Sequence, residues 1–397
     1  MKVTCDRGAL LEAINLASSV VATRSPRPQL TCIKLTAERK GKAGTLTLAA
    51  TDGEISIRLS VAQVDVQTPG EALLPADKLR QIVSAEDNEP TLSLETDENL
   101  VCHIRGNDAH FKLIGQPAGE FPPITEFRAA VAGSGGRPPA KAVFTHDARS
   151  LGELISRTLF ATARETSRYA INGVLMVREG KRLQMVATDG RRLALSRATL
   201  SGGEKDAPPV RCIVPSKGLS TLQKLLGGSD ETVQIAVTDN QVYFNVGAPD
   251  AKDHADGRAV LSSNLVEGAF PPYEDVIPKD QDKTIVVDRD ALTSAVHRAA
   301  LLTNEESRGV RMAFDSKGRQ AHLSAHASEV GEANVELSLA EYKGDDIEIG
   351  FNPAFITDAL KVIADPQVVI ELKASNKPGL IKSGQDFTYV VMPVNLS

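Results

Sequence analysis

The chain contains 397 residues, of which 45 are basic and 51 acidic, so its formal net charge is -6; aromatic residues make up only 4%, and there is no Trp. This length predicts two to four domains of about 100 to 200 residues each, and so few aromatic residues argue against an RNA-binding protein that stacks bases on aromatic side chains. The acidic total argues against a general grip on phosphates, although it does not exclude a local basic surface.

The sequence shows no targeting or membrane signal. No apolar run approaches the ~18 residues of a membrane span, and the N-terminus lacks the apolar core of a signal peptide. Four widely separated cysteines form no Cys-x-x-Cys pair, namely Cys5, Cys32, Cys102 and Cys212. This pattern argues against a disulfide scaffold or zinc ribbon and favours a cytoplasmic location.

The first third of the chain predicts strands in clusters around two helices. A strand-like start leads into an amphipathic helix at Asp6–Leu11, and Ala50-Thr51-Asp52-Gly53-Glu54 between alternating runs predicts a hairpin turn. A further strand ends at Leu74-Pro75 and opens a second helix, because Pro is well tolerated in the first helical turn.

The same order of elements recurs twice along the chain. The helix-opening leucines Leu10, Leu151 and Leu292 are 141 positions apart each time, and Pro75, Pro215 and Pro353 follow at spacings of 140 and 138. The Ala-Thr-Asp-Gly turn recurs at Ala187–Gly190, 137 positions after the first. A period of this size exceeds solenoid repeats of 20 to 50 residues. It therefore predicts three copies of one domain.

The segments between the copies predict the domain boundaries. Ala130–Ala140 is a Gly/Pro-rich linker and Lys279–Lys283 a short charged hinge. We therefore expect domains at 1–130, 131–280 and 281–397. Strands clustered around isolated helices favour an α+β fold with two helices and antiparallel sheets in each domain.

Cationic side chains recur at matching places in the three copies. In the second copy, four arginines share one helical arc away from the leucines if the helix extends through all of them; these are Arg149, Arg157, Arg164 and Arg168. A solvated helix face explains one such helix, but recurrence predicts one shared basic surface. The other members are Arg24, Arg27, Lys78, Arg80, Lys217, Lys224, Arg308, Arg311 and Lys361.

Catalytic and metal-binding motifs are absent from the sequence. It contains no phosphate-binding glycine motif and no His-Glu-x-x-His, and its seven histidines are scattered. His322 and His326 lie on strand-like sequence, where residues four apart are about 13 Å apart, too far for one metal. Asp52 and Asp189 are better explained as turn residues than as a catalytic pair. We therefore predict no catalytic residues, no metal and no cofactor.

Several short motifs, in order along the whole chain, resemble the bacterial DNA polymerase III beta subunit family, the sliding clamps. They are Met1-Lys2-Val3-Thr4, the two Ala-Thr-Asp-Gly turns, Arg168–Gly173, Phe270-Pro271-Pro272-Tyr273, Asn304–Arg311 and Tyr389–Val394. The resemblance implies a DNA-clamp fold and a homodimeric closed ring of six similar domains, which encircles duplex DNA without reading sequence, acts as a processivity factor and is not an enzyme. Its place would be the cytoplasm, at the nucleoid.

The resemblance also implies three sets of site residues. DNA-facing residues would be Arg24, Arg168, Tyr169, Lys217, Arg308 and Arg311. A cleft for short peptide motifs of the replicative polymerase alpha subunit, the clamp loader, other polymerases and repair proteins would comprise Ile171, Thr188, Gly190, Arg192, Leu193, Pro271, Val276, Phe355, Pro378, Val390, Met392, Pro393 and Val394. Head-to-tail subunit contacts would pair Phe111 and Leu113 with Leu301 and Leu302.

Two features leave alternatives open. The cleft residues could instead be core, above all Leu193 and Val390, and the chain departs from the family pattern at Asp275, Ala170, Asp108 and His110. The alternative functions are a three-domain protein-binding scaffold that does not encircle DNA, as in a diverged clamp paralogue, and an enzyme without a recognisable site.

Overall fold

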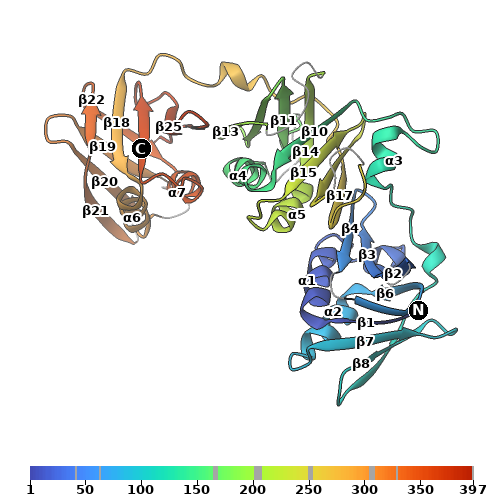
Figure 1. The fold of residues 1–397 in the computed structure, drawn as a ribbon. Coiled ribbons are helices and arrows are strands. Elements are labelled where there is room, and N and C mark those ends of the chain that lie inside the picture. Colours follow the sequence, from blue (N-terminus) through green and yellow to red (C-terminus); the bar gives the residue numbers. More distant parts are fainter. Residues whose placement is uncertain are drawn as a thin grey trace. The chain divides into compact units, whose positions relative to one another are not determined.

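A computed structural model describes residues 1–40, 43–61, 64–163, 169–200, 208–248, 254–303, 309–327 and 330–395 (Figure 1). The chain divides into two compact units. Unit 1 comprises Met1–Gly152, Leu200–Val210 and Lys217–Leu265, and unit 2 comprises Glu153–Thr199, Arg211–Ser216 and Val266–Ser397. No described helix is long and apolar enough to cross a membrane.

The first repeat lies entirely in unit 1. Its elements are β1 (Lys2–Asp6), α1 (Arg7–Ser18), η1 (Pro28–Thr31), β2 (Cys32–Lys40), β3 (Ala43–Thr51), β4 (Ile55–Val61), β5 (Val64–Thr68), β6 (Gly70–Pro75), α2 (Ala76–Ala85), β7 (Thr91–Thr96), β8 (Val101–Arg105), β9 (His110–Ile114), η2 (Ala118–Glu120) and α3 (Phe127–Ala132). All of its described strand pairs are antiparallel.

The second repeat contributes to both units. Its elements are β10 (Ala142–Asp147), α4 (Ala148–Leu159), β11 (Gly173–Glu179), β12 (Arg182–Thr188), β13 (Arg192–Thr199), β14 (Val210–Pro215), α5 (Ser216–Leu226), β15 (Thr232–Val237), β16 (Gln241–Val246) and β17 (Ala259–Asn264). Strands β10 and β15–β17 extend a sheet of unit 1, in the order β10-β15-β16-β17-β4-β3-β2-β6. The remaining unit 1 sheet has the order β5-β1-β7-β8-β9.

The third repeat lies in unit 2. Its elements are η3 (Tyr273–Asp275), β18 (Lys283–Asp288), α6 (Arg289–Ala300), β19 (Val310–Asp315), β20 (Gln320–Ala327), β21 (Gly331–Ser338), β22 (Glu341–Lys343), β23 (Ile347–Phe351), α7 (Pro353–Lys361), β24 (Gln367–Leu372), β25 (Gly379–Ser383) and β26 (Phe387–Val391). The two sheets here run β14-β11-β12-β13-β26-β25-β24-β18-β22 and β21-β20-β19-β23.

The predicted threefold repeat is confirmed at the level of single residues. Each first helix starts behind an aspartate whose Oδ1 accepts an amide hydrogen bond in the first turn: Ala9 N to Asp6 at 2.7 Å, Ser150 N to Asp147 at 2.8 Å and Ala291 N to Asp288 at 2.8 Å. Such a cap stabilises a helix by about 1 kcal/mol.

The buried stripe of each first helix has one spacing. It is Leu10, Ala13, Ile14 and Ala17 in α1, Leu151, Leu154, Ile155 and Thr158 in α4, and Leu292, Ala295, Val296 and Ala299 in α6. Burying each leucine or isoleucine contributes about 1.5 to 3 kcal/mol. The helices therefore form because one apolar face, repeated at helical spacing, packs on its own sheets.

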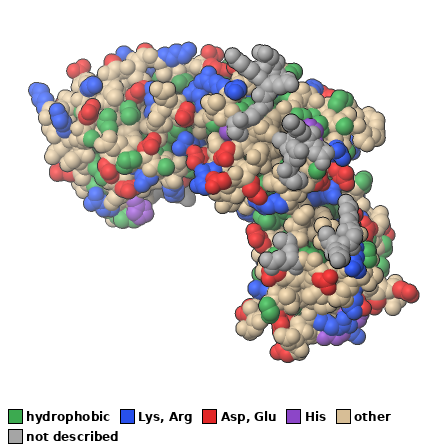
Figure 2. Space-filling model, in the orientation of Figure 1, with side chains coloured by type: hydrophobic (Ala, Val, Ile, Leu, Met, Phe, Trp, Pro, Cys, Tyr) green, Lys and Arg blue, Asp and Glu red, His purple; other side chains and the backbone are tan. Residues whose placement is uncertain are grey.

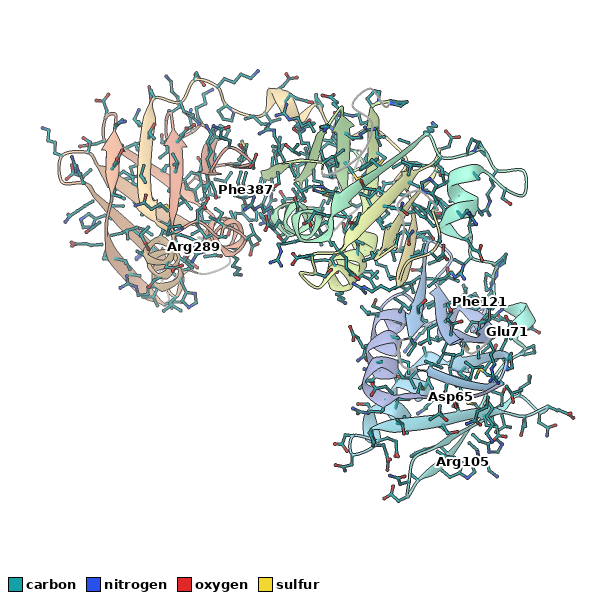
Figure 3. The ribbon with its side chains drawn as sticks, in the orientation of Figure 1. Asp65, Glu71, Arg105, Phe121, Arg289 and Phe387 are labelled. Carbon is teal, nitrogen blue, oxygen red and sulfur yellow. The ribbon has the colours of Figure 1, made fainter. Side chains whose placement is uncertain are left out.

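Each outer repeat also closes its helix pair with an arginine. Arg7 donates to the carbonyls of Val83 and Ser84 at the end of α2, both at 3.0 Å. Arg289 donates to the carbonyl of Ile363, just beyond α7, at 2.6 Å (Figure 3). These guanidiniums bind carbonyls that have no partner inside the helix.

Two predictions about connections are wrong in part. The linker expected at Ala130–Ala140 begins inside α3, because Phe127 and Ala130 are spaced to bury one face against Ala236 and Tyr243 of the second repeat. The charged hinge at Lys279–Lys283 ends in strand β18, where Asp282 accepts hydrogen bonds from Lys283 and Lys373. These two hydrogen bonds lower the pKa of Asp282 to about 2.

Candidate functional site

Each unit contains one joint at which a sheet passes from one repeat into the next. In unit 1, β4 of the first repeat pairs with β17 of the second, from Ile55↔Ser263 to Leu59↔Ala259. In unit 2, β13 of the second repeat pairs with β26 of the third, from Arg192↔Val391 to Ser196↔Phe387. We call these the first and second joints.

Both joints begin at the predicted Thr-Asp-Gly turns, which are confirmed as hairpin turns. In the second turn the Thr188 hydroxyl donates to the Arg192 carbonyl at 2.7 Å and accepts from Gly190 N at 3.1 Å, while Asp189 Oδ1 accepts from two amides. The first turn makes the same bonds with Thr51, Gly53 and Asp52. Gly53 and Gly190 have φ values of 97° and 87°, which favour glycine.

The two joints differ in the group that binds the second carboxylate oxygen of the turn aspartate. In the first turn, Asp52 Oδ2 accepts a hydrogen bond from Lys217 at the start of α5. Burial opposes ionisation of Asp52, but the bonds from Lys217 and from backbone amides outweigh it and lower its pKa. In the second turn, Asp189 Oδ2 binds the guanidinium of Arg192, three residues away, at 3.0 Å.

Arg192 is the centre of a buried polar network beside the second joint. Only 11% of its side chain is exposed, and it donates to Asp358 of α7 at 2.9 Å and to the Phe160 carbonyl at 2.9 Å. The guanidinium also lies 4.4 Å from the centre of the Phe355 ring. Burial opposes its charge, but the hydrogen bond to Asp358 and nearby charges keep the pKa of Arg192 above its ordinary value. The network therefore holds α7 against β13.

The predicted cleft residues lie on and around the second joint, all in unit 2. Met392 and Val276 expose 40% and 47% of their surface, unusually much for large apolar residues, and Met392 N donates to the Arg191 carbonyl at 2.9 Å. Half-buried side chains accompany them, namely Pro271, Phe355, Pro378, Pro393 and Val394. The set provides an apolar surface with a flexible methionine, which suits peptides of varied shape.

Other members of that set are buried or have a structural role. Ile171, Leu193 and Val390 belong to one buried cluster, and Leu193 and Val390 are only 2% and 1% exposed. Thr188 and Gly190 shape the turn, and Arg192 holds the network. For Leu193 and Val390 the structure thus gives the core position that the sequence left open. They form the floor of the apolar surface and do not present side chains to solvent.

The predicted DNA-facing residues are only partly described. Arg168 and Arg308 lie outside the described residues, as does Arg164. Arg24 is exposed in the segment after α1, and Tyr169 is 44% exposed. Lys217 is paired with Asp52, and Arg311 on β19 is paired with Glu348 at 2.6 Å. Of the four arginines predicted to share one helical arc, only Arg149 and Arg157 lie on α4, because α4 ends at Leu159. The DNA-facing set therefore stays a prediction.

The predicted subunit contacts lie on two strand edges. Phe111 and Leu113 are on β9, the last strand of its sheet, and Gly331 of edge strand β21 lies beside Leu302, since a Cβ there would meet that side chain at 3.8 Å. Leu113 is only 8% exposed, whereas Leu301 is 66% exposed. The sequence missed two more exposed apolar side chains at these edges, Ile114 at 73% and Val330 at 56%, and a third, Leu100 at 42%, in the turn just before β8.

Charged and histidine side chains gather over the sheet that contains β8 and β9 (Figure 2). The His103 and His110 rings stack with centroids 5.3 Å apart, and Arg105 binds Glu95 at 2.8 Å (Figure 3). Desolvation and the positive charges of Arg105, His103 and Lys112 lower the pKa of His110.

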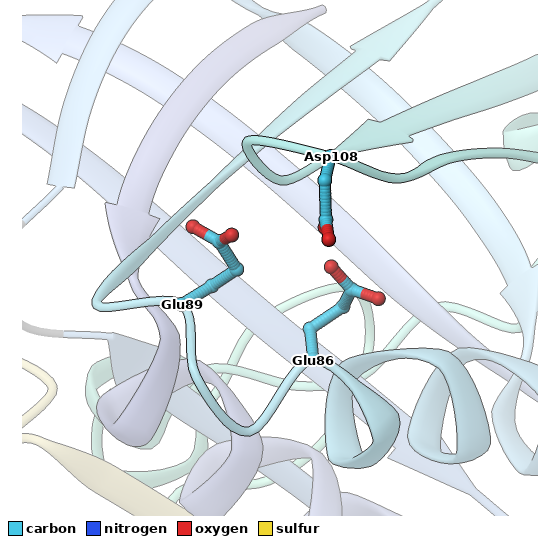
Figure 4. Close-up of side chains that lie close together, drawn as sticks. All are labelled: Glu86, Glu89 and Asp108. Atoms are coloured by element: carbon cyan, nitrogen blue, oxygen red, sulfur yellow. The ribbon is translucent and has the colours of Figure 1, made fainter.

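Three carboxylates meet near the start of β9, where the sequence predicted no metal. One oxygen from each of Glu86, Glu89 and Asp108 lies within 4.8 Å of the others (Figure 4). Gly106 permits this approach, because a Cβ there would meet Glu86 Oε2 at 2.6 Å. Exposed acidic groups are common without an ion, and we assign no metal to this cluster.

The sequence missed the residues that support Arg192. Phe160 and Asp358 carry no motif, and Tyr389, although it opens one of the motifs, was not predicted as a site residue; all three reach Arg192 only through the fold. The Tyr389 hydroxyl donates to the Phe355 carbonyl at 2.9 Å, and burial raises the pKa of Tyr389. Asp189 alone had a sequence signal, since it recurs with Asp52.

Comparison with known proteins covers the whole chain. Family models match in succession: the DNA polymerase III beta subunit N-terminal domain at residues 1–125, its central domain at 146–272 and its C-terminal domain at 274–395. Among curated proteins, the beta sliding clamp of Caulobacter vibrioides is 35% identical and that of Pseudomonas aeruginosa 34% identical, each over 100% of both chains.

Solved structures agree with the sequence comparisons. The sliding clamp of Pseudomonas aeruginosa bound to griselimycin has a TM-score of 0.86 at 33% identity, and the DNA polymerase sliding clamp of Bacillus subtilis has 0.86 at 26% identity, each covering 100% of both chains. The fold is therefore the three-domain clamp fold that the sequence predicted. The chain belongs to the DNA polymerase III beta subunit family, the sliding clamps that act as processivity factors in DNA replication.

Proposed function

We propose that two copies of this chain close head to tail into a ring around duplex DNA, and that the apolar surface at the second joint tethers polymerases and other partners to it. The observation that carries the proposal is a pair of open strand edges, that of β9 in the first repeat and that of β21 in the third. Strand β4 of the first repeat and strand β13 of the second each pair with a strand of the next repeat. Strand β21 holds the corresponding position in the third repeat. Among the described residues, its outer edge is unpaired, as is that of β9.

The repeat gives the register of this third joint. Counting from the capping aspartates, Lys112 of β9 takes the place of Ser262 in β17. Counting back from the second helices, Asn334 of β21 takes the place of Arg58 in β4. In the first joint Ser262 faces Ser56 and Val260 faces Arg58. The same register sets Lys112 opposite Glu332 of the partner subunit and His110 opposite Asn334 of the partner subunit.

The side chains at the two edges suit this register. Lys112 and Glu332 carry opposite charges and are both exposed. At the first joint, Asn264 N donates a hydrogen bond to the Glu54 carbonyl at 2.9 Å. The exposed Ile114 takes the place of Asn264 and the exposed Val330 takes the place of Glu54. Pairing across subunits would cover exposed apolar side chains and remove two open edges that otherwise invite aggregation.

Topology, rather than charge, would hold the DNA. A net charge of -6 is compatible with a sliding ring because strong phosphate contacts would slow movement along DNA. We place Arg24, Arg168, Tyr169, Lys217, Arg308 and Arg311 toward the duplex. For Lys217 and Arg311 this role competes with their ion pairs to Asp52 and Glu348, so their contribution to DNA contact is small.

The remaining assignments follow from the same family. We propose a non-catalytic subunit that works at the nucleoid in the cytoplasm, needs no cofactor, and meets the polymerase alpha subunit, the clamp loader and repair proteins through short peptides. The domain boundaries at 1–130, 131–280 and 281–397 stay proposals; α3 packs on the second repeat, which favours a first boundary before Phe127. A scaffold that does not encircle DNA is not favoured.

The ring is tested by retention on DNA. With its clamp loader, the protein should stay on nicked circular DNA through gel filtration and be lost when the same DNA is linearised, since a sliding ring leaves through free ends. Its mass in solution should be about twice 42.3 kDa. Equal retention on both DNAs would sink the topological tether.

The peptide surface is tested by Met392→Ala with Pro393→Ala. Removing this apolar surface should weaken binding of a polymerase-derived peptide by about 10- to 100-fold, a few kcal/mol as for anchor residues, while the dimer mass and melting temperature stay unchanged. Fluorescence anisotropy and sedimentation measure the two properties. Unfolding of the variant would show that both residues are core instead.

A further inference from the structure

A pocket lined by polar side chains lies in unit 2, next to the segment that carries Val276 of the apolar surface. It has a volume of about 140 Å³ and is lined by Val177, Glu179, Arg182, Gln184, Arg211, Tyr273 and Glu274. Strands β11, β12 and β14 provide most of the lining, and the turn η3 provides Tyr273 and Glu274. The residue that follows η3 is Val276, part of the apolar surface, so the two sites share one short segment.

The pocket and the apolar surface also share a sheet face. Leu193, Leu195 and Arg197 alternate along β13 and therefore point to the same side, and Arg197 faces Gln184 of β12. Leu193 forms the floor of the apolar surface, and Gln184 lines the pocket. The four residue steps from Leu193 to Arg197 span about 13 Å at about 3.3 Å per step. An extended peptide crosses that distance with about four residues.

Two guanidiniums line this pocket, and a third, that of Arg197, is bonded to one of the lining residues. Arg197 Nε donates to Gln184 Oε1 at 3.1 Å, and the Gln184 amide nitrogen donates to the Tyr273 hydroxyl at 2.5 Å. Arg211 lies over the Tyr273 ring at 6.0 Å from its centre. Burial, together with the charge of Arg182, lowers the pKa of Arg197. The chain from Arg197 through Gln184 to Tyr273 fixes the back wall of the pocket.

The arginines of this pocket have no counterion among the described residues. Within the described residues, no carboxylate lies within 4.0 Å of Arg182, Arg197 or Arg211, although Glu179 and Glu274 line the same pocket. Arg182 and Arg211 are exposed and Arg197 is half-buried, so an anion that enters the pocket gains charge-assisted hydrogen bonds without displacing an ion pair to a described carboxylate. Because two carboxylates already line the pocket, a monoanion fits better than a doubly charged phosphate. Arg binds a carboxylate through paired hydrogen bonds.

We propose that this pocket is an outlying subsite of the partner-peptide surface that accepts an aspartate or glutamate side chain about four residues from the apolar anchor of a bound peptide. The inference rests on the proposed peptide-binding function. It assigns Arg182 and Arg211 as specificity residues that touch the acidic side chain, and Gln184 with Tyr273 as residues that position them.

The test measures how peptides bind by fluorescence anisotropy at low salt. The probe is the labelled C-terminal peptide of the partner polymerase alpha subunit, made with Glu or Gln four residues before or four residues after its apolar anchor. The wild-type protein should prefer Glu to Gln at one of the two places by about 3- to 10-fold, as for a partly exposed charge pair. Arg182→Gln with Arg211→Gln should abolish this preference and leave affinity for the Gln peptides unchanged.

The control is Lys181→Gln, which removes one positive charge in the exposed β11–β12 turn, outside the pocket lining. It should retain the preference. A preference that survives in the double variant, or that Lys181→Gln also removes, would overturn the subsite, as would wild-type binding of inorganic phosphate at Arg182 and Arg211 without any preference between peptides. Absence of binding by every peptide would overturn the peptide-binding function itself, whereas binding without preference overturns the subsite alone.

Discussion

The first and second joints have the same backbone and different surfaces. Both follow a Thr-Asp-Gly turn with the same hydrogen bonds, and both pair strands in the same register. At matching places, however, the first joint has Ser56, Ser262, Ser263 and Asn264, whereas the second has Leu193, Val390, Val391 and Met392. The pairing of strands is thus a general device for linking repeats, and a peptide surface arises only where the side chains on it are apolar.

The proposed third joint, between two subunits, would lie between these extremes. At the same places it would have Glu332 of one subunit with Lys112, Leu113 and Ile114 of the other, so it combines a charge pair with apolar contacts. Asp108 and His110, where the family pattern differs, flank these positions on β9 or just before it. The carboxylate cluster around Asp108 would lie opposite Glu336 of the partner subunit, which weakens this end of the joint at low salt.

The largest expected effect comes from breaking the third joint with Asn334→Pro. In the first joint, Ser60 N donates to the Arg258 carbonyl and Asn264 N to the Glu54 carbonyl. Every second residue of β4 therefore directs its backbone groups into the joint, and Arg58, the equivalent of Asn334, is one of them. Proline there removes a donor and blocks the approach of the neighbouring strand, while the bonds of β21 to β20 remain.

We expect the dimer of Asn334→Pro to weaken by about 100-fold or more, which corresponds to about 2.7 kcal/mol. Sedimentation at decreasing concentration measures this dissociation, and Asn334→Ala is the matched control with little change. A dimer of Asn334→Pro as tight as the wild type would mean that the joint uses another edge.

A medium effect separates the second joint from the first. Asp358→Ala should leave the buried Arg192 with one carboxylate partner fewer and destabilise the chain by about 1 to 3 kcal/mol. Lys217→Ala at the first joint removes a half-exposed partner of Asp52 and should cost less, about 0 to 1 kcal/mol. Chemical unfolding compares the two. Equal losses would show that the Arg192 network is no more important to folding than an ordinary surface pair.

The smallest effect is a pH dependence at the first joint. The pKa of Asp52 is lowered in the folded state, so its ionised form adds stability above its unfolded pKa near about 3.9. That contribution disappears as the pH falls from there through the folded pKa. The difference in unfolding free energy between the wild type and Asp52→Asn should therefore be constant from pH 5 to 7 and shrink below about pH 4. A difference that grew on acidification would contradict this sign.

Much of the fold could be predicted because the repeat leaves local signals. Helix starts and Thr-Asp-Gly turns depend on short stretches of sequence, and both were found in their predicted places. The aspartates that cap the first helices stand in the same stretches, but their hydrogen bonds became clear only in the structure. The predicted linker was wrong at α3, because this helix is fixed by packing of Phe127 on strands that are distant in the sequence.

The site was less accessible to sequence reasoning because it depends on contacts across the chain. The resemblance supplied Arg192 and Met392, but no pattern connects Asp358 or Phe160 to Arg192 from 166 and 32 positions away. The exposure of Ile114 and Val330 also needs the sheet edges to be known. Leu193 is the reverse case, a residue expected at the surface that is buried. The sequence alone does not tell whether an apolar residue in a strand is buried beneath a binding surface or exposed on it.

The closed ring depends most directly on the register of the third joint, which a cysteine pair tests. Lys112→Cys with Glu332→Cys places two exposed thiols directly opposite, where Cα atoms in such a strand pair are about 5.5 Å apart and within reach of a disulfide. Lys112→Cys with Asn334→Cys displaces them by two residues. The four native cysteines are buried and should not react. On mild oxidation, the first variant should give one discrete covalent dimer under denaturing, non-reducing conditions, and the second should remain monomeric. A ladder of higher species, or equal cross-linking of both variants, would contradict the closed ring with this register.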